Sequence, residues 1–279
     1  MIHTGEQVRF LLFKPFEIVD GHQNAGLVLI ADHAGRQIPP QYGTLGLPAA
    51  EFERHIAFDI GVEALTRALC AELEASAVLA NFSRLLVDAN RNEDDPTLIR
   101  QIYDHTIIPG NLKITTKERE HRLNAFFRPY QNAVRDSVDS AWQASKSPPL
   151  IVSLHSFTPK LANGAPRPWH IGLLSDKDRR ATDALLISLE AELDMIVGDN
   201  EPYDGALKGD TLYWQATARG LSHVLIEVRQ DLISNVAGAL TWAKRLAPHI
   251  LALNAMAELH ELRFFGSRAG GLETTEELL

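Results

Sequence analysis

The sequence predicts an α/β fold with a mostly parallel sheet covered by helices on both faces. Short apolar runs alternate with longer amphipathic stretches, as expected for strands joined by helical crossovers. Polar residues of chemical interest follow several apolar runs, and no internal repeat or low-complexity linker interrupts the pattern. We therefore expect a single domain over residues 1–265. Residues 266–279, GSRAGGLETTEELL, are expected to form a flexible tail.

The predicted strands are short and almost entirely apolar, which is typical of strands buried on both faces. They are LVLIA (27–31), AVLAN (77–81), LIVSL (150–154), HIGLLS (170–175) and SHVLIEV (222–228). Apolar spacing predicts helices over residues 48–75, 116–145, 178–193 and 232–263. Pro129 is expected to kink or divide the second helix, and a break is expected near Pro248 in the last.

Composition excludes several classes of partner. The formal net charge of -9 offers no basic field for nucleic acid or an anionic membrane. No apolar run approaches the ~20 residues that span a bilayer, and the N-terminus lacks the features of a secretory signal. Cys70 is the single cysteine, so no internal disulfide forms. We expect a cytoplasmic protein, monomeric or a small homo-oligomer, without nucleic-acid or membrane partners.

Polar side chains stand near the ends of four predicted strands. They are Asp32 and His33, then Arg84, Asp88, Asn90 and Arg91, then His155, and finally Glu227. Because ligands bind at the carboxyl ends of strands in open α/β sheets, we expect these residues to converge on one crevice. Glu227 lies between Ile226 and Val228, and a buried carboxylate needs a partner. Glu227 either acts as a functional group in the crevice or forms a structural ion pair with Arg229 or Arg84.

Two imidazoles and one carboxylate can hold Zn²⁺ with a position left for water. Such a site, with a glutamate as proton acceptor and an arginine for the oxyanion, performs metal-assisted amide hydrolysis. His33 and His155 are the candidate imidazole ligands. The third ligand stays open, with Asp59 preferred over Glu51 and His55. The alternative is that no metal binds.

Six segments in order resemble the N-formylglutamate amidohydrolase family. They are DHAGRQIPP, HIAFDIGVEAL, NFSRLLVDANR, SLHSFTP, NEPYDG and LIEVRQDLI. This family is distantly similar to zinc carboxypeptidases and to the aspartoacylase and succinylglutamate desuccinylase group. The resemblance implies a phosphorylase/hydrolase-like three-layer α/β/α sandwich with a mostly parallel mixed sheet. It also implies a divalent metal, expected to be zinc.

The same resemblance implies roles for individual residues. His33 and His155 correspond to metal ligands, with Asp59 as the candidate third. Glu227 corresponds to the general base, and Arg84 to the residue that polarises the scissile carbonyl. Asn90 and Arg91 correspond to the pair that binds the substrate carboxylate. Ser156 and Tyr203 are further candidates for substrate contact, although the loop that carries Tyr203 can equally be a plain turn.

Three functions remain open at this point. The first is hydrolysis of a small N-acyl acidic amino acid, with N-formyl-L-glutamate as lead substrate, giving formate and glutamate. The second is the same chemistry on another N-acyl amino acid or a short peptide, since the segment TLYWQATARG lacks the histidine expected of true deformylases. The third is a metal-free protein that binds a small molecule.

Overall fold

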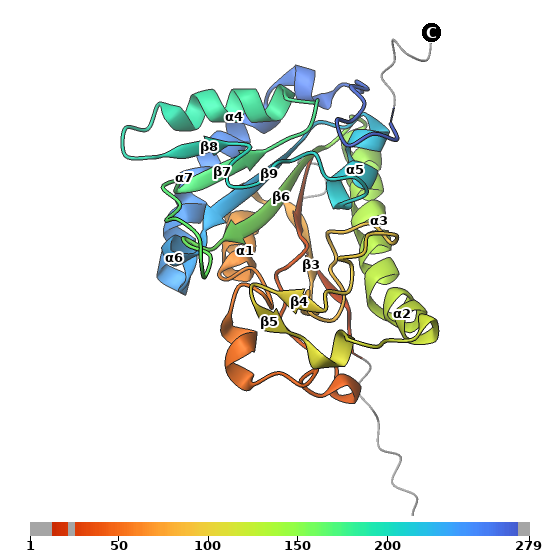
Figure 1. The fold of residues 1–279 in the computed structure, drawn as a ribbon. Helices are drawn as coiled ribbons and strands as arrows, with labels where there is room; N and C mark the ends of the chain where they lie inside the picture. The colour runs from red at the N-terminus through yellow and green to blue at the C-terminus, as the bar shows by residue number, and fades with distance from the viewer. Residues whose placement is uncertain (1–12, 22–25, 273–279) are drawn as a thin grey trace, which may run out of the picture.

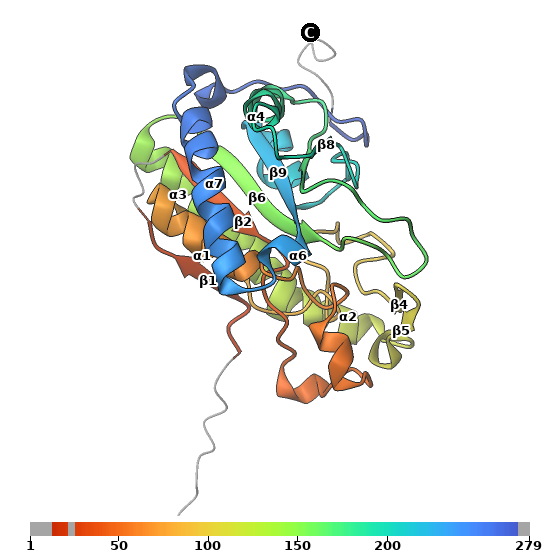
Figure 2. The same ribbon diagram turned by 90° about the vertical axis from the view of Figure 1, so that its left-hand side faces the viewer.

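A seven-stranded mixed sheet lies between two layers of helices (Figures 1 and 2). The computed structural model describes residues 13–21 and 26–272. The strand order is β1-β3-β2-β6-β9-β7-β8. Neighbouring strands are parallel except for the pairs β1–β3 and β7–β9, which are antiparallel. The predicted α/β sandwich with a mostly parallel mixed sheet is confirmed.

The strands of this sheet are β1 (Phe16–Val19), β2 (Leu27–Ala31), β3 (Ser76–Ala80), β6 (Leu150–Phe157), β7 (Ile171–Leu174), β8 (Val197–Asp199) and β9 (His223–Arg229). A separate hairpin pairs β4 (Ile102–Tyr103) with β5 (Thr106–Ile107). Strands β3, β2, β6 and β9 run in the same direction, so their carboxyl ends lie along one edge.

The helices are α1 (Val62–Leu73), α2 (Thr116–Arg122), α3 (Arg128–Ser145), α4 (Arg180–Glu190), α5 (Thr211–Gln215), α6 (Gln230–Ile233) and α7 (Val236–Asn254). Short helical turns are η2 (Pro40–Tyr42), η3 (Ala49–Glu53), η4 (Pro109–Asn111), η5 (Leu123–Phe127), η6 (Thr217–Arg219) and η7 (Ala257–His260). Helices α1, α4 and α7 cover one face of the sheet, and α3 with η5 covers the other (Figure 2).

Strand β2 illustrates why both faces are apolar. Leu27, Leu29 and Ala31 point into the core beneath α1 and α7. Val28 and Ile30 point into the core beneath α3. Successive side chains of a strand alternate between faces, so a strand buried on both sides must be apolar throughout.

The helix predicted over residues 48–75 is two elements separated by a loop. Residues Ala49–Glu53 form the 3-10 turn η3, and the α-helix begins only at Val62. Gly61 sits between them with φ +83, and a Cβ there would lie 2.1 Å from the carbonyl oxygen of Ile233. This left-handed residue interrupts the helix, so the prediction of continuous helix was wrong. Asp59 consequently lies in the loop that precedes α1.

The two prolines in long helices have different effects. Next to Pro129 the helix is divided as predicted: α2 passes through the π-helical turn η5 into α3, and Pro129 is the second residue of α3. The break predicted near Pro248 was wrong, because α7 continues through it. Leu246 and Ile250 are fully buried on either side of Pro248. Their packing offsets the cost of an interior proline, about 3 kcal/mol.

The segment predicted as a flexible tail is described only up to residue 272. Within it, the backbone N–H of Arg268 donates to Asp176 Oδ1 over 2.8 Å. The hydroxyl of Tyr213 donates to the carbonyl of Gly270 over 2.9 Å. Residues 273–279 lie outside the described part of the chain. Among the described helices, none combines the length and apolarity that crossing a membrane requires.

Candidate metal centre and active-site cavity

A cavity of about 520 Å³ opens at the carboxyl ends of β2, β6 and β9. This volume suits a small-molecule ligand. All nine predicted site residues line the cavity: His33, Asp59, Arg84, Asn90, Arg91, His155, Ser156, Tyr203 and Glu227. The parallel strands bring these segments together from positions up to almost two hundred residues apart.

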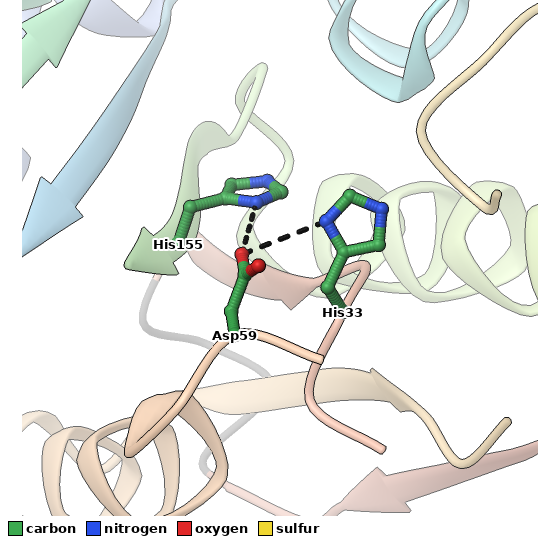
Figure 3. A group of neighbouring side chains, drawn as sticks. All are labelled: His33, Asp59 and His155. Carbon is green, nitrogen blue, oxygen red and sulfur yellow. Dashed lines mark hydrogen bonds and ion pairs between the residues drawn. The ribbon is translucent and has the colours of Figure 1, made fainter. Parts of the chain in front are cut away.

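Three buried side chains form a group that can hold a metal ion. One ligand atom from each of His33, Asp59 and His155 lies within 4.8 Å of the other two (Figure 3). Asp59 Oδ2 is 2.9 Å from His155 Nδ1 and 3.5 Å from His33 Nδ1. The alternatives for the third ligand lie outside this group: Glu51 pairs with Arg54, and His55 Nε2 is 3.6 Å from Asp104.

The far nitrogen of each imidazole is held by a second carboxylate. His33 Nε2 is 2.7 Å from Asp88 Oδ1, and His155 Nε2 is 3.2 Å from Asp32 Oδ2. Each contact suits an imidazole that donates its Nε2 proton outward and presents a bare Nδ1 to the shared space. His33 Nδ1 has no hydrogen-bond partner among the described residues, although it is buried. This nitrogen–oxygen–nitrogen donor set fits zinc or a similar divalent cation.

Negative charge around His155 also fits a cation in this space. Burial alone would lower the pKa of His155. Hydrogen bonds with Asp32 and Asp59, together with the charges of Asp59 and Glu227, instead raise this pKa well above its ordinary value. Burial alone would raise the pKa of Asp59. The charges of His33 and Arg84 hold it below its ordinary range, so the carboxylate is ionised.

His155 lies inside a strand rather than beyond its end. Strand β6 continues to Phe157, so the prediction that the strand stops at residue 154 was wrong. His155 pairs in register with Glu227 of β9. Because β6 and β9 are parallel and hydrogen-bonded here, both side chains project from the same face of the sheet.

Glu227 is buried, with 7% of its surface exposed, and lines the cavity. Its Oε2 has no hydrogen-bond partner among the described residues. The ion pairs that would give it a purely structural role are made elsewhere: Arg229 pairs with Asp231, and Arg84 with Asp59. Burial, reinforced by the charge of Asp59 and opposed by His155, raises the pKa of Glu227 to about 7. A carboxylate with such a pKa can accept and return a proton near neutral pH.

Arg84 connects the metal-binding group to the loop after β3. Its Nη1 donates to Asp59 Oδ1 over 2.9 Å, and its Nη2 donates to Asp88 Oδ2 over 3.4 Å. A guanidinium carries five N–H donors, so protons remain for a ligand in the cavity. Asp88 thereby contacts both His33 and Arg84.

The other predicted residues surround the remaining space. Asn90 Oδ1 accepts from the backbone N–H of Thr211 over 3.0 Å, which leaves its amide protons as donors. Arg91 Nη1 donates to the carbonyl of Asn90 over 2.7 Å. The hydroxyl of Ser156 donates to the carbonyl of Ile60 over 2.9 Å, which leaves it an acceptor toward a ligand. Tyr203 accepts at its hydroxyl from Arg167 Nη1 over 3.0 Å.

Sequence reasoning missed several residues of this cavity. Asp32 and Asp88 stood out near strand ends, but their contacts with the outer nitrogens of the histidines were not predicted. Arg100 and Tyr103 also line the cavity, because the segment carrying β4 folds over it. Arg100 precedes β4 and Tyr103 ends it, and this two-residue strand has no buried apolar pattern, so no sequence signal pointed to either of them.

Known proteins resemble the chain in sequence and in fold. The family profile described as N-formylglutamate amidohydrolase matches residues 25–234. A crystal structure of gene product Atu2144 from Agrobacterium tumefaciens is 34% identical, with a TM-score of 0.80, covering 89% of this chain and 97% of that one. The N-formylglutamate amidohydrolase from Ralstonia eutropha JMP134 is 25% identical, with a TM-score of 0.67, covering 86% and 97%. A search of curated proteins finds no match.

The fold, the cavity and these similarities define an amidohydrolase enzyme that acts on a small amino acid derivative. The family profile covers well over half of the sequence. The chain belongs to the N-formylglutamate amidohydrolase family.

Proposed function

We propose that the chain hydrolyses the amide bond of a small N-acyl acidic amino acid, with N-formyl-L-glutamate as the lead substrate. The observation that carries this proposal is the buried group of His33, Asp59 and His155 beside a carboxylate, Glu227, whose Oε2 has no described partner. The similarity to the Ralstonia eutropha enzyme supports the choice of substrate.

His33, Asp59 and His155 would hold the divalent metal, with zinc expected from the nitrogen and carboxylate donors. When bound, such an ion supplies Lewis-acid activation of water and of the amide carbonyl. Asp88 and Asp32 then have a positioning role, because each fixes the orientation of one imidazole through its Nε2 proton.

Glu227 serves as the proton acceptor and donor. It takes one proton from the attacking water while the water oxygen forms a bond to the acyl carbon. It then gives that proton to the amide nitrogen as the carbon–nitrogen bond breaks. With N-formyl-L-glutamate the products are formate and glutamate, and the carboxylate returns to its starting state.

Arg84 stabilises the oxyanion that develops on the scissile carbonyl, using N–H groups that Asp59 and Asp88 leave free. Asn90 and Arg91 bind a substrate carboxylate through an amide and a guanidinium. Ser156 and Tyr203, which also line the cavity, are the further candidates for contact with the substrate. An Arg91→Gln variant should chiefly raise KM, because it removes binding energy that the ground state and transition state share.

Formate release from N-formyl-L-glutamate tests the proposal. Activity should disappear with a chelator and return with zinc, and N-acetylglutamate and N-acetylaspartate should be hydrolysed more slowly. Faster acetate release would make another N-acyl amino acid the substrate. Less than about 0.1 equivalent of metal after reconstitution, with no turnover of any substrate, would instead favour a metal-free binding protein. A cytoplasmic location and a monomeric or small homo-oligomeric state stay predictions.

A further inference from the structure

Arg100 is a cavity residue whose guanidinium has no hydrogen-bonded carboxylate among the described residues. Only 18% of its side chain is exposed, yet its guanidinium donates no hydrogen bond to any described residue. Its Nε is buried without a partner in the described part of the chain. The ring of Tyr103 lies 4.5 Å from the guanidinium carbon. This ring offsets only part of the cost of burying a cation.

The nearest carboxylate cannot neutralise Arg100 fully. Asp88 Oδ2 is 3.8 Å from Arg100 Nε, beyond hydrogen-bond distance, and the same oxygen accepts from Arg84. The other oxygen of Asp88 faces His33 and also accepts from the backbone N–H of Asn90. Burial, with the charges of Arg91 and Arg84, accordingly lowers the pKa of Arg100 despite the opposing charge of Asp88.

The arginines of the cavity divide into two kinds. Arg84 is bound by two carboxylates, Asp59 and Asp88. Arg91 donates to a neutral carbonyl, and Arg100 donates to no described acceptor. Two guanidinium groups in one cavity therefore lack a hydrogen-bonded carboxylate among the described residues. A ligand with two carboxylates would satisfy both of them.

We propose that Arg100 binds the side-chain carboxylate of an N-acyl amino dicarboxylate while Asn90 and Arg91 bind its α-carboxylate. This inference rests on the proposed function and adds a residue that selects for the second negative charge. A neutral side chain at that position of the substrate would leave the buried cation without a hydrogen-bonded carboxylate, so the cavity disfavours it.

The decisive measurement is the selectivity between two substrates, N-formyl-L-glutamate and N-formyl-L-glutamine. The ratio of their kcat/KM values should favour glutamate in the wild type and fall at least tenfold in Arg100→Gln, mainly through KM for glutamate. Arg100→Lys, which keeps the charge without the planar fork, should give an intermediate ratio. Arg135→Gln, on the exposed surface of α3, is the matched control and should keep the wild-type ratio.

An unchanged ratio in folded Arg100→Gln and Arg100→Lys would overturn the proposal, as would a wild-type enzyme without preference for glutamate. If the wild type hydrolyses neither substrate, the proposed function fails and Arg100 is tested by calorimetry on the metal-loaded full chain. Glutarate should then bind at least tenfold more tightly than butyrate, and Arg100→Gln should lose this difference. The same preference in wild type and variant would overturn the assignment.

Discussion

The two faces of the central strands differ in a way that separates folding from chemistry. Beneath α1 and α7, the side chains of β2, β6 and β9 are apolar, apart from Ser156 near the carboxyl end of β6. Beneath α3 the same strands carry apolar residues in their first halves, with Val28, Ile151 and Leu225, although β9 starts at His223. They then become polar toward their carboxyl ends, with Ser153, His155 and Glu227.

This difference shows how the fold can carry buried charge. The face under α1 and α7 supplies most of the hydrophobic burial of these strands, and it fixes their spacing. The other face can then hold Asp32, Asp59 and Asp88, which need specific partners. We expect changes on the first face to reduce stability and changes at the carboxyl ends of the second face to reduce catalysis or metal binding.

Replacement of Glu227 by Gln should give the largest functional effect. The variant keeps the size of the side chain but cannot accept a proton, so kcat should fall about 10³-fold. The melting temperature should not fall, because a neutral amide is easier to bury than a carboxylate. Formate release and calorimetry measure the two quantities, and the exposed Glu72→Gln on α1 serves as control.

Turnover of Glu227→Gln within tenfold of the wild type would remove Glu227 from the mechanism. A large loss of stability with full metal content would instead make it a structural residue, contrary to the contrast between the two faces.

On the face under α1 and α7, Leu29→Ala in β2 should lower the free energy of unfolding by about 3 kcal/mol, because it leaves a cavity in a fully buried core. The kcat of the folded fraction should stay near that of the wild type. Denaturant unfolding measures the first quantity. Leu29→Met, which nearly conserves volume, is the matched control and should cost less than about 1.5 kcal/mol. A selective loss of kcat in folded Leu29→Ala would contradict the separation of the faces.

Sequence patterns predicted the apolar face better than the polar one, for a physical reason. Strand β2 matches its predicted bounds, because continuous burial leaves a continuous apolar signal. Strand β6 was predicted too short, since His155 and Ser156 are polar residues buried within a strand. Burial of such residues depends on partners such as Asp32 and Ile60, which come from distant parts of the chain.

The predicted site residues gather in one cavity, but their local structure was only partly predictable. Asp59 lies in an unpredicted loop, because η3 ends at Glu53 and α1 begins only at Val62, after the left-handed residue Gly61. The lack of a hydrogen-bonded carboxylate at Arg100 was beyond prediction, since it depends on how Asp88 divides its oxygens between Arg84 and His33.

Asp88→Asn tests whether the polar face orients the metal-binding group. Burial would raise the pKa of Asp88, but Arg84 and His33 hold it well below its ordinary value, so the native residue is a carboxylate. The amide is a weaker acceptor for His33 Nε2. Zinc affinity should therefore fall about 10- to 100-fold. Competition with a chromophoric chelator measures this affinity, and the exposed Asp136→Asn is the control. Unchanged affinity would remove Asp88 from the support of His33.

Tyr130→Phe should give the smallest effect. It tests a residue that does not contact the imidazoles itself but contacts Asp32, which holds His155. The buried hydroxyl of Tyr130 donates to Asp32 Oδ1 over 2.9 Å, and the hydroxyl of Thr211 donates to the same oxygen over 2.6 Å. Burial and the charge of Asp32 raise the pKa of Tyr130 well above its ordinary value, so the phenol stays a donor. Because Thr211 remains, the free energy of unfolding should fall by only about 1 kcal/mol.

Zinc affinity of Tyr130→Phe should fall by less than about tenfold, since Asp32 still holds His155. The matched control is Tyr42→Phe, whose buried hydroxyl has no hydrogen-bond partner in the described part of the chain. It should change neither quantity. A loss in Tyr130→Phe as large as that in Asp88→Asn would mean that the outer hydrogen bonds act as one cooperative network. The orientation of the two imidazoles would then depend on α3 as much as on the carboxylates.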